Sequence, residues 1–315
     1  ANITAMSGGR LTIKVYSAGE LVPALECLGA VANGTAQMGH DAAYYHAGKS
    51  EGCAFFTAFP FGFTMGEMAA WIKHGNGQKL WDELYAPFGI RGFQAGSTGT
   101  QMFGWFRREI RSLADLDGLK FRTPGNQGRV LQKLGVTPVS VPGGAILPAL
   151  QSGAIDGAEW GGPYNDLALG FYQVCRYYYS PGYHEPGPAL QLTVNEQAWR
   201  SLPSDLQAIV RAAADAATTD MYAEYTAQSG PALRTLVQKH GVIVRSLPED
   251  VLIACGQKSN EVLNEIHAGD TSPNRIVRRI IEDFLEFRKD VIPWTRVGEQ
   301  AFVNARRLPF EFRLK

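Results

Sequence analysis

The sequence has few cysteines and no long hydrophobic run. The cysteines, at positions 27, 53, 175 and 255, form no CxxC pair, so neither a redox motif nor a zinc site is indicated. No stretch reaches the ~18 apolar residues that a membrane-spanning helix needs, and Pro60 and Gly62 interrupt the apolar segment Cys53–Phe63. We therefore expect no membrane span and at most one or two disulfides, whose pairing the sequence leaves open.

Neither sign of charge is in excess. Lys plus Arg is 30 and Asp plus Glu is 30. This balance argues against a nucleic-acid binder, which needs basic residues to neutralise phosphates, and against a polybasic membrane-surface module. With 45% hydrophobic and 19% charged residues, the chain has the composition of a folded protein. At roughly 100–200 residues per domain, 315 residues predict one large or two medium domains.

Short strand-like and helix-like segments alternate through the middle of the chain. Leu119–Arg122 and Ala154–Trp160 are predicted strands, and a helical segment follows each. Such alternation indicates α/β units with parallel strands. Nearer the start, Arg10–Tyr16 alternates apolar and polar residues, which predicts a further strand with one buried face.

The last third of the chain is predicted to be helical. Pro203–Gln228 has the pattern of one long helix, which Gly230-Pro231 should break or kink. Two further helices are predicted over Val251–Ile266 and Ile276–Lys289, with Gly269–Pro273 interrupting them. The domains should therefore be followed by long C-terminal helices.

Nucleophilic catalysis and phosphate binding have little support. The sequence contains no GxSxG motif, and its six histidines are scattered. The glycine-rich turn Gly96–Thr100 lacks the lysine of a P-loop.

Charged residues stand where three predicted strands end. Arg122 closes one strand, Glu159 and Trp160 close another, and His184 and Glu185 follow a tyrosine-rich strand. Ligands of open α/β sheets bind beyond the carboxyl ends of the strands. An arginine there can bind a carboxylate through a two-point fork. Two glutamates beside it would repel an anion unless a hard cation such as Na⁺ or Ca²⁺ sat between them. Taken singly, these features also suit a surface arginine, an ion pair and a plain turn.

The residues around these strand ends form sequence blocks with a specific order and spacing. The blocks are Gln101–Phe106, Leu119–Gly125, Leu134–Val139, Ala149–Trp160, Glu159–Asp166 and Tyr177–Gly187. In them the chain resembles, over nearly its whole length, the periplasmic solute-binding subunits of tripartite ATP-independent periplasmic (TRAP) transporters, the DctP-like family. It is most similar to the branch of that family that binds 2-oxo acids and lactate.

This resemblance implies an α/β two-domain periplasmic binding protein fold, with mixed sheets flanked by helices, a cleft between the domains and long C-terminal helices. Residues 1–95 with about 190–220 would form domain I and residues 96–189 domain II, and helices in 221–315 would pack on both. Family members usually begin with a strand and a helix before the block at Met6–Leu11. We therefore expect the first strand of domain I, and a signal peptide, to lie outside this sequence.

The resemblance also implies roles for single residues. Arg122 matches the arginine that pairs with the substrate carboxylate. The carboxylates of Glu159 and Glu185, the side-chain amide of Gln101 and the backbone carbonyl of Trp160 match the ligands of a Na⁺ or Ca²⁺ ion that bridges to the substrate. Tyr45 and Phe61 match the pocket wall of domain I. The predicted substrate-binding residues are thus Arg122, Gln101, Trp160, Glu185, Tyr45 and Phe61.

The predicted function is that of a periplasmic solute-binding protein without catalysis or organic cofactor. It would deliver a small monocarboxylate, a 2-oxo acid such as pyruvate or a 2-hydroxy acid such as lactate, to TRAP membrane permease subunits. One alternative is a metal-assisted lyase or hydrolase that uses the same glutamates with His184, and another is a ligand sensor. Some members of this branch are dimers through a C-terminal helix, whereas the interruption at Gly269–Pro273 favours a monomer, so the oligomeric state stays open.

Overall fold

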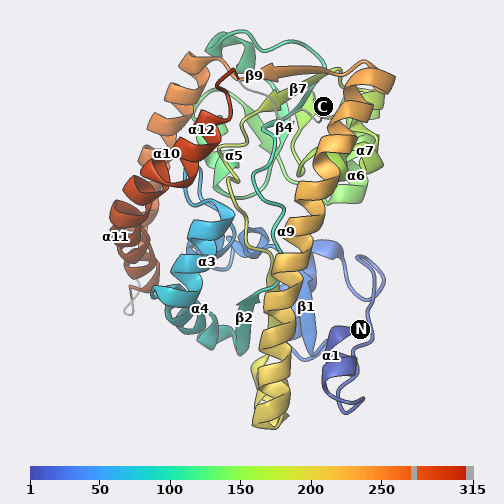
Figure 1. Ribbon diagram of the computed structural model, residues 1–315, viewed down its shortest axis with the longest axis vertical. Coiled ribbons are helices and arrows are strands. Elements are labelled where there is room, and N and C mark those ends of the chain that lie inside the picture. Colours follow the sequence, from blue (N-terminus) through green and yellow to red (C-terminus); the bar gives the residue numbers. More distant parts are fainter. Residues whose placement is uncertain (271–274, 310–315) are drawn as a thin grey trace.

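The computed structural model, which describes residues 1–270 and 275–309, is a two-domain α/β fold (Figure 1). Domain I is built on a three-stranded sheet and domain II on a six-stranded sheet. The 37-residue helix α9 (Ser204–His240) runs along both domains, as Figure 1 shows.

The sheet of domain I is antiparallel, with strand order β1-β8-β2. It consists of β1 (Met38–Asp41), β8 (Gln191–Asn195) and β2 (Ile90–Gln94). Asp41 is paired with Gln191, and Gln191 is paired in turn with Gln94. These three polar residues therefore form one row at the end of the sheet.

Helices and 3₁₀ turns surround this sheet and form an aromatic core. They are α1 (Asn2–Met6), η1 (Ala24–Glu26), α2 (Cys27–Ala32), η2 (Ala43–His46), η3 (Glu51–Phe56), α3 (Met65–His74), α4 (Gly77–Tyr85), η4 (Ala86–Phe88) and α8 (Glu196–Ser201). Phe56 stacks between Trp71 and Trp81, at ring-centroid distances of 5.4 and 4.8 Å. A capping box between Thr64 and Glu67 fixes the start of α3.

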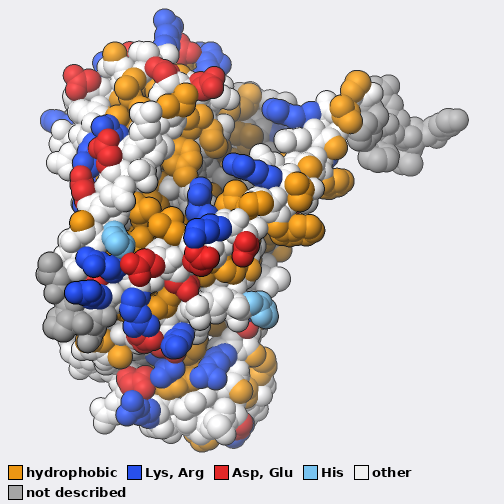
Figure 2. Space-filling model, turned by 90° about the vertical axis from the view of Figure 1, so that its left-hand side faces the viewer, with side chains coloured by type: hydrophobic (Ala, Val, Ile, Leu, Met, Phe, Trp, Pro, Cys, Tyr) orange, Lys and Arg blue, Asp and Glu red, His pale blue; other side chains and the backbone are white. Residues whose placement is uncertain are grey.

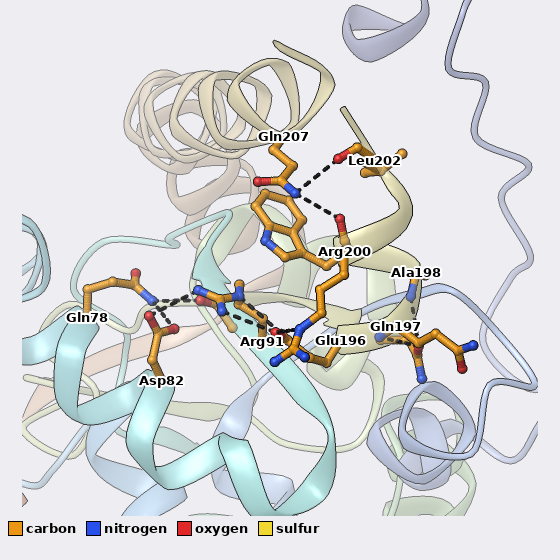
Figure 3. A network of polar contacts seen from close by, with 12 residues as sticks. Gln78, Asp82, Arg91, Glu196, Gln197, Ala198, Arg200, Leu202 and Gln207 are labelled. Atoms are coloured by element: carbon orange, nitrogen blue, oxygen red, sulfur yellow. Dashed lines mark hydrogen bonds and ion pairs between the residues drawn. The ribbon is translucent and has the colours of Figure 1, made fainter. Parts of the chain in front are cut away.

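The edge strand β2 is tied to two helices by Arg91 (Figure 3). Arg91 pairs with Asp82 of α4 and with Glu196 of α8, at 3.3 Å in each case. Arg200 also donates to Glu196, over 2.9 Å. Because these side chains are partly exposed, each pair contributes little free energy, and the network mainly orients the strand edge.

The sheet of domain II is mixed, with strand order β5-β4-β6-β3-β7-β9. Its strands are β3 (Gly104–Phe106), β4 (Lys120–Arg122), β5 (Thr137–Val139), β6 (Gly157–Ala158), β7 (Tyr177–Ser180) and β9 (Ile243–Ser246). Strand β4 is parallel to β5 and β6, and β7 is parallel to β9, whereas β3 is antiparallel to both β6 and β7. The flanking helical elements are η5 (Leu113–Leu116), α5 (Gly125–Gln132), α6 (Gly143–Ser152), α7 (Pro163–Leu169) and η6 (Phe171–Gln173).

The C-terminal helices pack on both domains. Helix α9 contacts α7 in domain II and α1 and β2 in domain I. Helix α10 (Glu249–Gly269) packs on α5, and α11 (Ile276–Val297) packs on α10 and on α4. Helix α12 (Glu299–Ala305) follows and packs mainly on α11. None of the helices in the described residues is long and apolar enough to cross a membrane.

Two predictions about local structure were wrong, namely the strand over Arg10–Tyr16 and a break of the long helix at Gly230-Pro231. Residues 12–16 form no regular element and belong to neither sheet, and Val15 is 82% exposed. Apolar alternation forms a strand only where a neighbouring strand supplies hydrogen bonds, and none of the described strands flanks this segment. Helix α9 continues through Gly230-Pro231 to His240. Pro231 lies on the exposed side of α9, where the loss of one backbone hydrogen bond is tolerated more readily than in a core.

Candidate functional site

Arg122 and Glu159 meet at the carboxyl ends of two neighbouring parallel strands. Arg122 ends β4 and is paired with Ala158 of β6, so Glu159 comes directly after the paired position. The Arg122 Nη1 donates to Glu159 Oε1 over 2.7 Å and to the Glu159 carbonyl over 2.9 Å, and Nε donates to the Val141 carbonyl over 3.2 Å. The two side chains are only 2% and 0% exposed. The strand ends thus hold a buried, rigidly oriented guanidinium.

Gln101 and Glu185 join this pair from the neighbouring strands. Gln101 lies shortly before β3 and Glu185 follows β7, and because β3 is antiparallel to β6 and β7, both residues reach the same edge of the sheet. The Gln101 backbone N–H donates to the Glu185 carbonyl over 3.1 Å, and its Nε2 donates to Glu185 Oε2 over 2.7 Å. The structure therefore brings together four side chains from four separate sequence blocks.

Aromatic side chains cover this polar cluster. The Arg122 Cζ lies 5.0 Å from the centroid of the Trp160 ring, within cation–π range. Gly143 leaves room for the indole, because a Cβ at that position would lie 2.4 Å from Trp160 Cη2. Tyr45 of η2 in domain I lies near Arg122: burial raises the pKa of Tyr45, and the charge of Arg122 opposes the rise.

Phe61 packs beside the loop that carries Glu185. Its ring stacks on Tyr183 at a centroid distance of 4.6 Å, and its backbone N–H donates to the Tyr183 carbonyl over 2.7 Å. Its part in a pocket wall stays a prediction.

Burial and like charge dominate the electrostatics of the cluster. Burial raises the pKa of Glu185 well above its usual range and the nearby Glu159 raises it further, whereas Tyr44 and the charge of Arg122 oppose the rise. Burial alone would lower the pKa of Arg122, but Glu159 and Tyr45 leave that pKa raised. Two ionised carboxylates against one guanidinium leave an unbalanced negative charge, which is costly in a buried place.

Several buried polar atoms of the cluster have no hydrogen-bond partner among the described residues, namely Gln101 Oε1, Glu159 Oε2 and both ring nitrogens of His184. Glu159, His184 and Glu185 offer ligand atoms that all lie within 4.8 Å of one another. Buried polar atoms are normally satisfied, and hard cations take carboxylate and amide oxygens. The residues present therefore fit a bound cation such as Na⁺ or Ca²⁺.

Sequence reasoning missed two members of the cluster. Tyr44, which interacts electrostatically with Glu185, had no signal beyond its place next to Tyr45. His184 was considered only as a base in an enzyme, although its Nε2 lies 3.5 Å from Glu159 Oε2. Its position next to Glu185 was the one available signal.

Comparisons with known proteins agree in family and fold. The model of the DctP family, described as bacterial extracellular solute-binding protein family 7, matches residues 1–270. The chain is 40% identical over 302 residues to a monocarboxylate 2-oxoacid-binding periplasmic protein of a Nostoc species. The aligned region covers 96% of this chain and 82% of the relative.

Two solved structures of TRAP solute-binding proteins are similar throughout. One, from Bordetella bronchiseptica, is a dimer with calcium and picolinate in one active site and an apo second site; it has a TM-score of 0.94 and 37% identity, covering 97% of this chain and 89% of that one. The other, from Pseudoalteromonas atlantica, has bound sodium and pyruvate. Its TM-score is 0.92 and its identity 40%, and the match covers 98% of this chain and 92% of that one. The family match spans well over half of the chain, and these relatives cover nearly all of it. The chain therefore belongs to the DctP family, the bacterial extracellular solute-binding proteins of family 7.

Proposed function

We propose that this protein captures a small 2-oxo monocarboxylate, with pyruvate as the type, together with Na⁺ or Ca²⁺, and delivers it in the periplasm to the membrane subunits of a TRAP transporter. The observation that carries the proposal is the buried cluster of Arg122, Glu159, Glu185 and Gln101, in which a guanidinium lies beside carboxylate and amide oxygens without partners. The relatives with bound pyruvate or picolinate and a cation support it.

In this proposal each side chain has a distinct task. Arg122 binds the ligand carboxylate and fixes its orientation, because its Nε and Nη1 are already anchored to protein oxygens. Glu159, Glu185, the Gln101 amide oxygen and the Trp160 carbonyl hold the cation. A bound cation supplies positive charge that offsets the buried carboxylates and attracts the ligand anion.

Domain I completes the site in this proposal. Tyr45 covers Arg122 from the opposite domain, and Phe61 contributes to the wall through its stack on Tyr183. With Arg122 and Glu159 almost fully buried, the structure has the enclosed arrangement in which charge-assisted contacts are strongest. The enzyme alternative is set aside, because the family consists of solute-binding proteins.

The decisive variants are Arg122→Ala and Arg122→Lys, because a lysine keeps the charge and loses the planar guanidinium. A charge-assisted hydrogen bond contributes about 1.5–3 kcal/mol, so the loss of the guanidinium contact should weaken pyruvate binding by roughly tenfold or more in Arg122→Ala and by less in Arg122→Lys. Arg91→Ala is the matched control, because Arg91 is an ion-paired arginine outside the site. Calorimetry in calcium measures the affinities, and pyruvate recovered chemically unchanged excludes turnover. Unaltered affinity in Arg122→Ala would contradict the proposal.

We also propose that two copies associate through the C-terminal helices. Trp294 and Val297 are 70% and 73% exposed at the end of α11, and Phe302 of α12 is 60% exposed. Figure 2 shows this segment projecting from the body of the molecule with hydrophobic side chains on its surface. Monomeric proteins rarely leave such apolar residues together in solvent, and the Bordetella relative is a dimer. This reverses the preference for a monomer that the Gly269–Pro273 interruption suggested; residues 271–273 lie outside the described residues.

A further inference from the structure

The 3₁₀ turn η2 is the element through which domain I reaches the polar cluster of domain II. Tyr44 interacts electrostatically with Glu185, and Tyr45 interacts electrostatically with Arg122. The two rings contact each other edge to face at a centroid distance of 4.8 Å. Tyr44 also lies against Gly125 at the start of α5. A Cβ added to Gly125 would lie 3.3 Å from the Cβ of Tyr44. Small displacements of this turn would therefore change both tyrosine contacts at once.

The turn has few backbone hydrogen bonds of its own. The Tyr45 N–H donates to the Ala42 carbonyl and the Ala47 N–H to the Tyr44 carbonyl, each over 3.1 Å, and the Tyr44 N–H donates to Thr57 Oγ1 over 3.2 Å. Short 3₁₀ segments have weak hydrogen-bond geometry and little intrinsic stability. The orientation of η2 must come largely from the side chains beneath it.

A chain of buried polar side chains lies beneath η2. It consists of His46, Asp41, Gln191 and Tyr85 and is here called the Asp41 network. His46, the last residue of η2, contacts Asp41 Oδ2 with its Nε2 at 2.6 Å, and the two side chains are 3% and 8% exposed. Asp41 Oδ1 accepts from Gln191 Nε2 over 2.6 Å, and Gln191 Oε1 accepts from the Tyr85 hydroxyl over 2.7 Å. The network thus links the turn to β1, to β8 and to α4.

The sheet fixes the far end of this network. Asp41 ends β1 and is paired with Gln191 of β8, so both acceptor and donor sit on backbone held by strand pairing. A hydrogen bond to a charged group is stronger than one between neutral groups. A buried network whose polar atoms are mostly hydrogen-bonded holds its side chains in one arrangement. His46 is the member that transmits this rigidity to η2.

We propose that His46 and Asp41 are positioning residues for solute binding, which hold the Tyr44–Tyr45 turn against Arg122 and Glu185. The inference rests on the proposed function for its ligand. Neither residue touches the cluster itself in the contacts described; both act through the two tyrosines. A purely structural role would instead make their loss lower stability without a specific effect on affinity.

The experiment compares His46→Ala, His46→Gln and Asp41→Asn with the unaltered chain, with pyruvate as the probe in saturating calcium. We expect His46→Ala to weaken pyruvate binding about tenfold, which corresponds to roughly 1.4 kcal/mol. His46→Gln should recover most of this loss, because its amide can donate to Asp41 from nearly the same position. Asp283→Ala is the matched control: Asp283 accepts from Trp71 and Asn76, over 2.7 Å in each case, at the α3–α11 contact. It should lower the melting temperature and leave affinity unchanged.

A double-substitution cycle tests whether His46 acts through the tyrosines. In a Tyr44→Phe, Tyr45→Phe background, His46→Ala should weaken binding by less than about twofold, because the contacts that it positions are already lost. The same weakening in both backgrounds, unchanged affinity in His46→Ala, or an equal effect of Asp283→Ala would overturn the proposal.

Amide hydrogen exchange gives a readout that needs no ligand. Exchange at Tyr45 and Ala47 should become at least about tenfold faster in His46→Ala and stay unchanged in Asp283→Ala. Unaltered exchange at these amides would overturn the positioning role. If the unaltered chain did not bind pyruvate, the proposed function would fail, and the exchange result would decide on the positioning of the turn by itself.

Discussion

Asp166 next to the site makes the stability of the protein depend on pH. Its Oδ2 accepts from Trp105 Nε1 over 2.9 Å and from the Tyr178 hydroxyl over 2.7 Å. Burial raises the pKa of Asp166 from 3.8 to about 7, and the hydrogen bonds from Tyr178 and Trp105 oppose the rise. The folded protein therefore keeps a proton on Asp166 at pH values where the unfolded chain has lost it.

The sign and size of the effect follow from this pKa. Below about pH 4 Asp166 is protonated in both the folded and the unfolded protein, so it has no effect on stability. As pH rises from about 4 to about 7, the free energy of unfolding decreases, because only the unfolded chain loses the proton. Above about pH 7 the folded protein bears the full cost of a buried charge. The rise from 3.8 to about 7 corresponds to roughly 4 kcal/mol at 1.36 kcal/mol per pH unit. Asp166→Asn removes the charge and keeps an oxygen for both donors.

Denaturant unfolding of both proteins in chelator, across about pH 4 to pH 8, tests this reasoning. The two should have similar free energies of unfolding near pH 4, and Asp166→Asn should be more stable near pH 8 by up to roughly 4 kcal/mol. Other titrating groups are common to both proteins and largely cancel in the difference. Parallel stability curves for the two proteins would refute the reasoning, and so would a variant that is less stable at pH 8.

Two further predictions concern the cation and the C-terminal helices. Burial and Glu159 raise the pKa of Glu185, so Glu185→Gln should stabilise the cation-free protein at neutral pH. The same variant should bind calcium roughly tenfold or more weakly. A Glu185→Gln variant with the calcium affinity of the unaltered chain in calorimetry would count against the predicted cation ligands. A Trp294→Ser, Phe302→Ser double variant should be monomeric in light scattering where the unaltered chain is dimeric; a monomeric unaltered chain would rule out the association.

Sequence reasoning placed two of the predicted site residues, Arg122 and Glu159, at the ends of strands. Arg122 and Glu159 follow short apolar segments, and the structure places both at the carboxyl ends of the adjacent strands β4 and β6. Strand ends can be recognised from local pattern, and parallel neighbours then bring them together. The domain boundaries, in contrast, stay a prediction.

The remaining errors come from interactions that a local pattern does not contain. Strand Ile90–Gln94 was not predicted, because Arg91 and Gly92 break its apolar pattern, yet β8 pairs with it along its whole length. Residues 12–16 have the right alternation without a partner strand among those described. Tyr44 and Glu185 are far apart in the sequence and interact only in the folded chain. Such contacts depend on tertiary structure rather than on spacing along the chain.

The proposed function depends most on the coupling between cation and organic anion at one buried cluster. Its direct test is calorimetric titration of the protein with pyruvate in calcium, in sodium, and after exhaustive chelation in a buffer that contains neither. We predict that a cation strengthens pyruvate binding at least about tenfold, and that pyruvate strengthens binding of that cation by the same factor, as linkage requires. Equal pyruvate affinity under all three conditions would contradict the account.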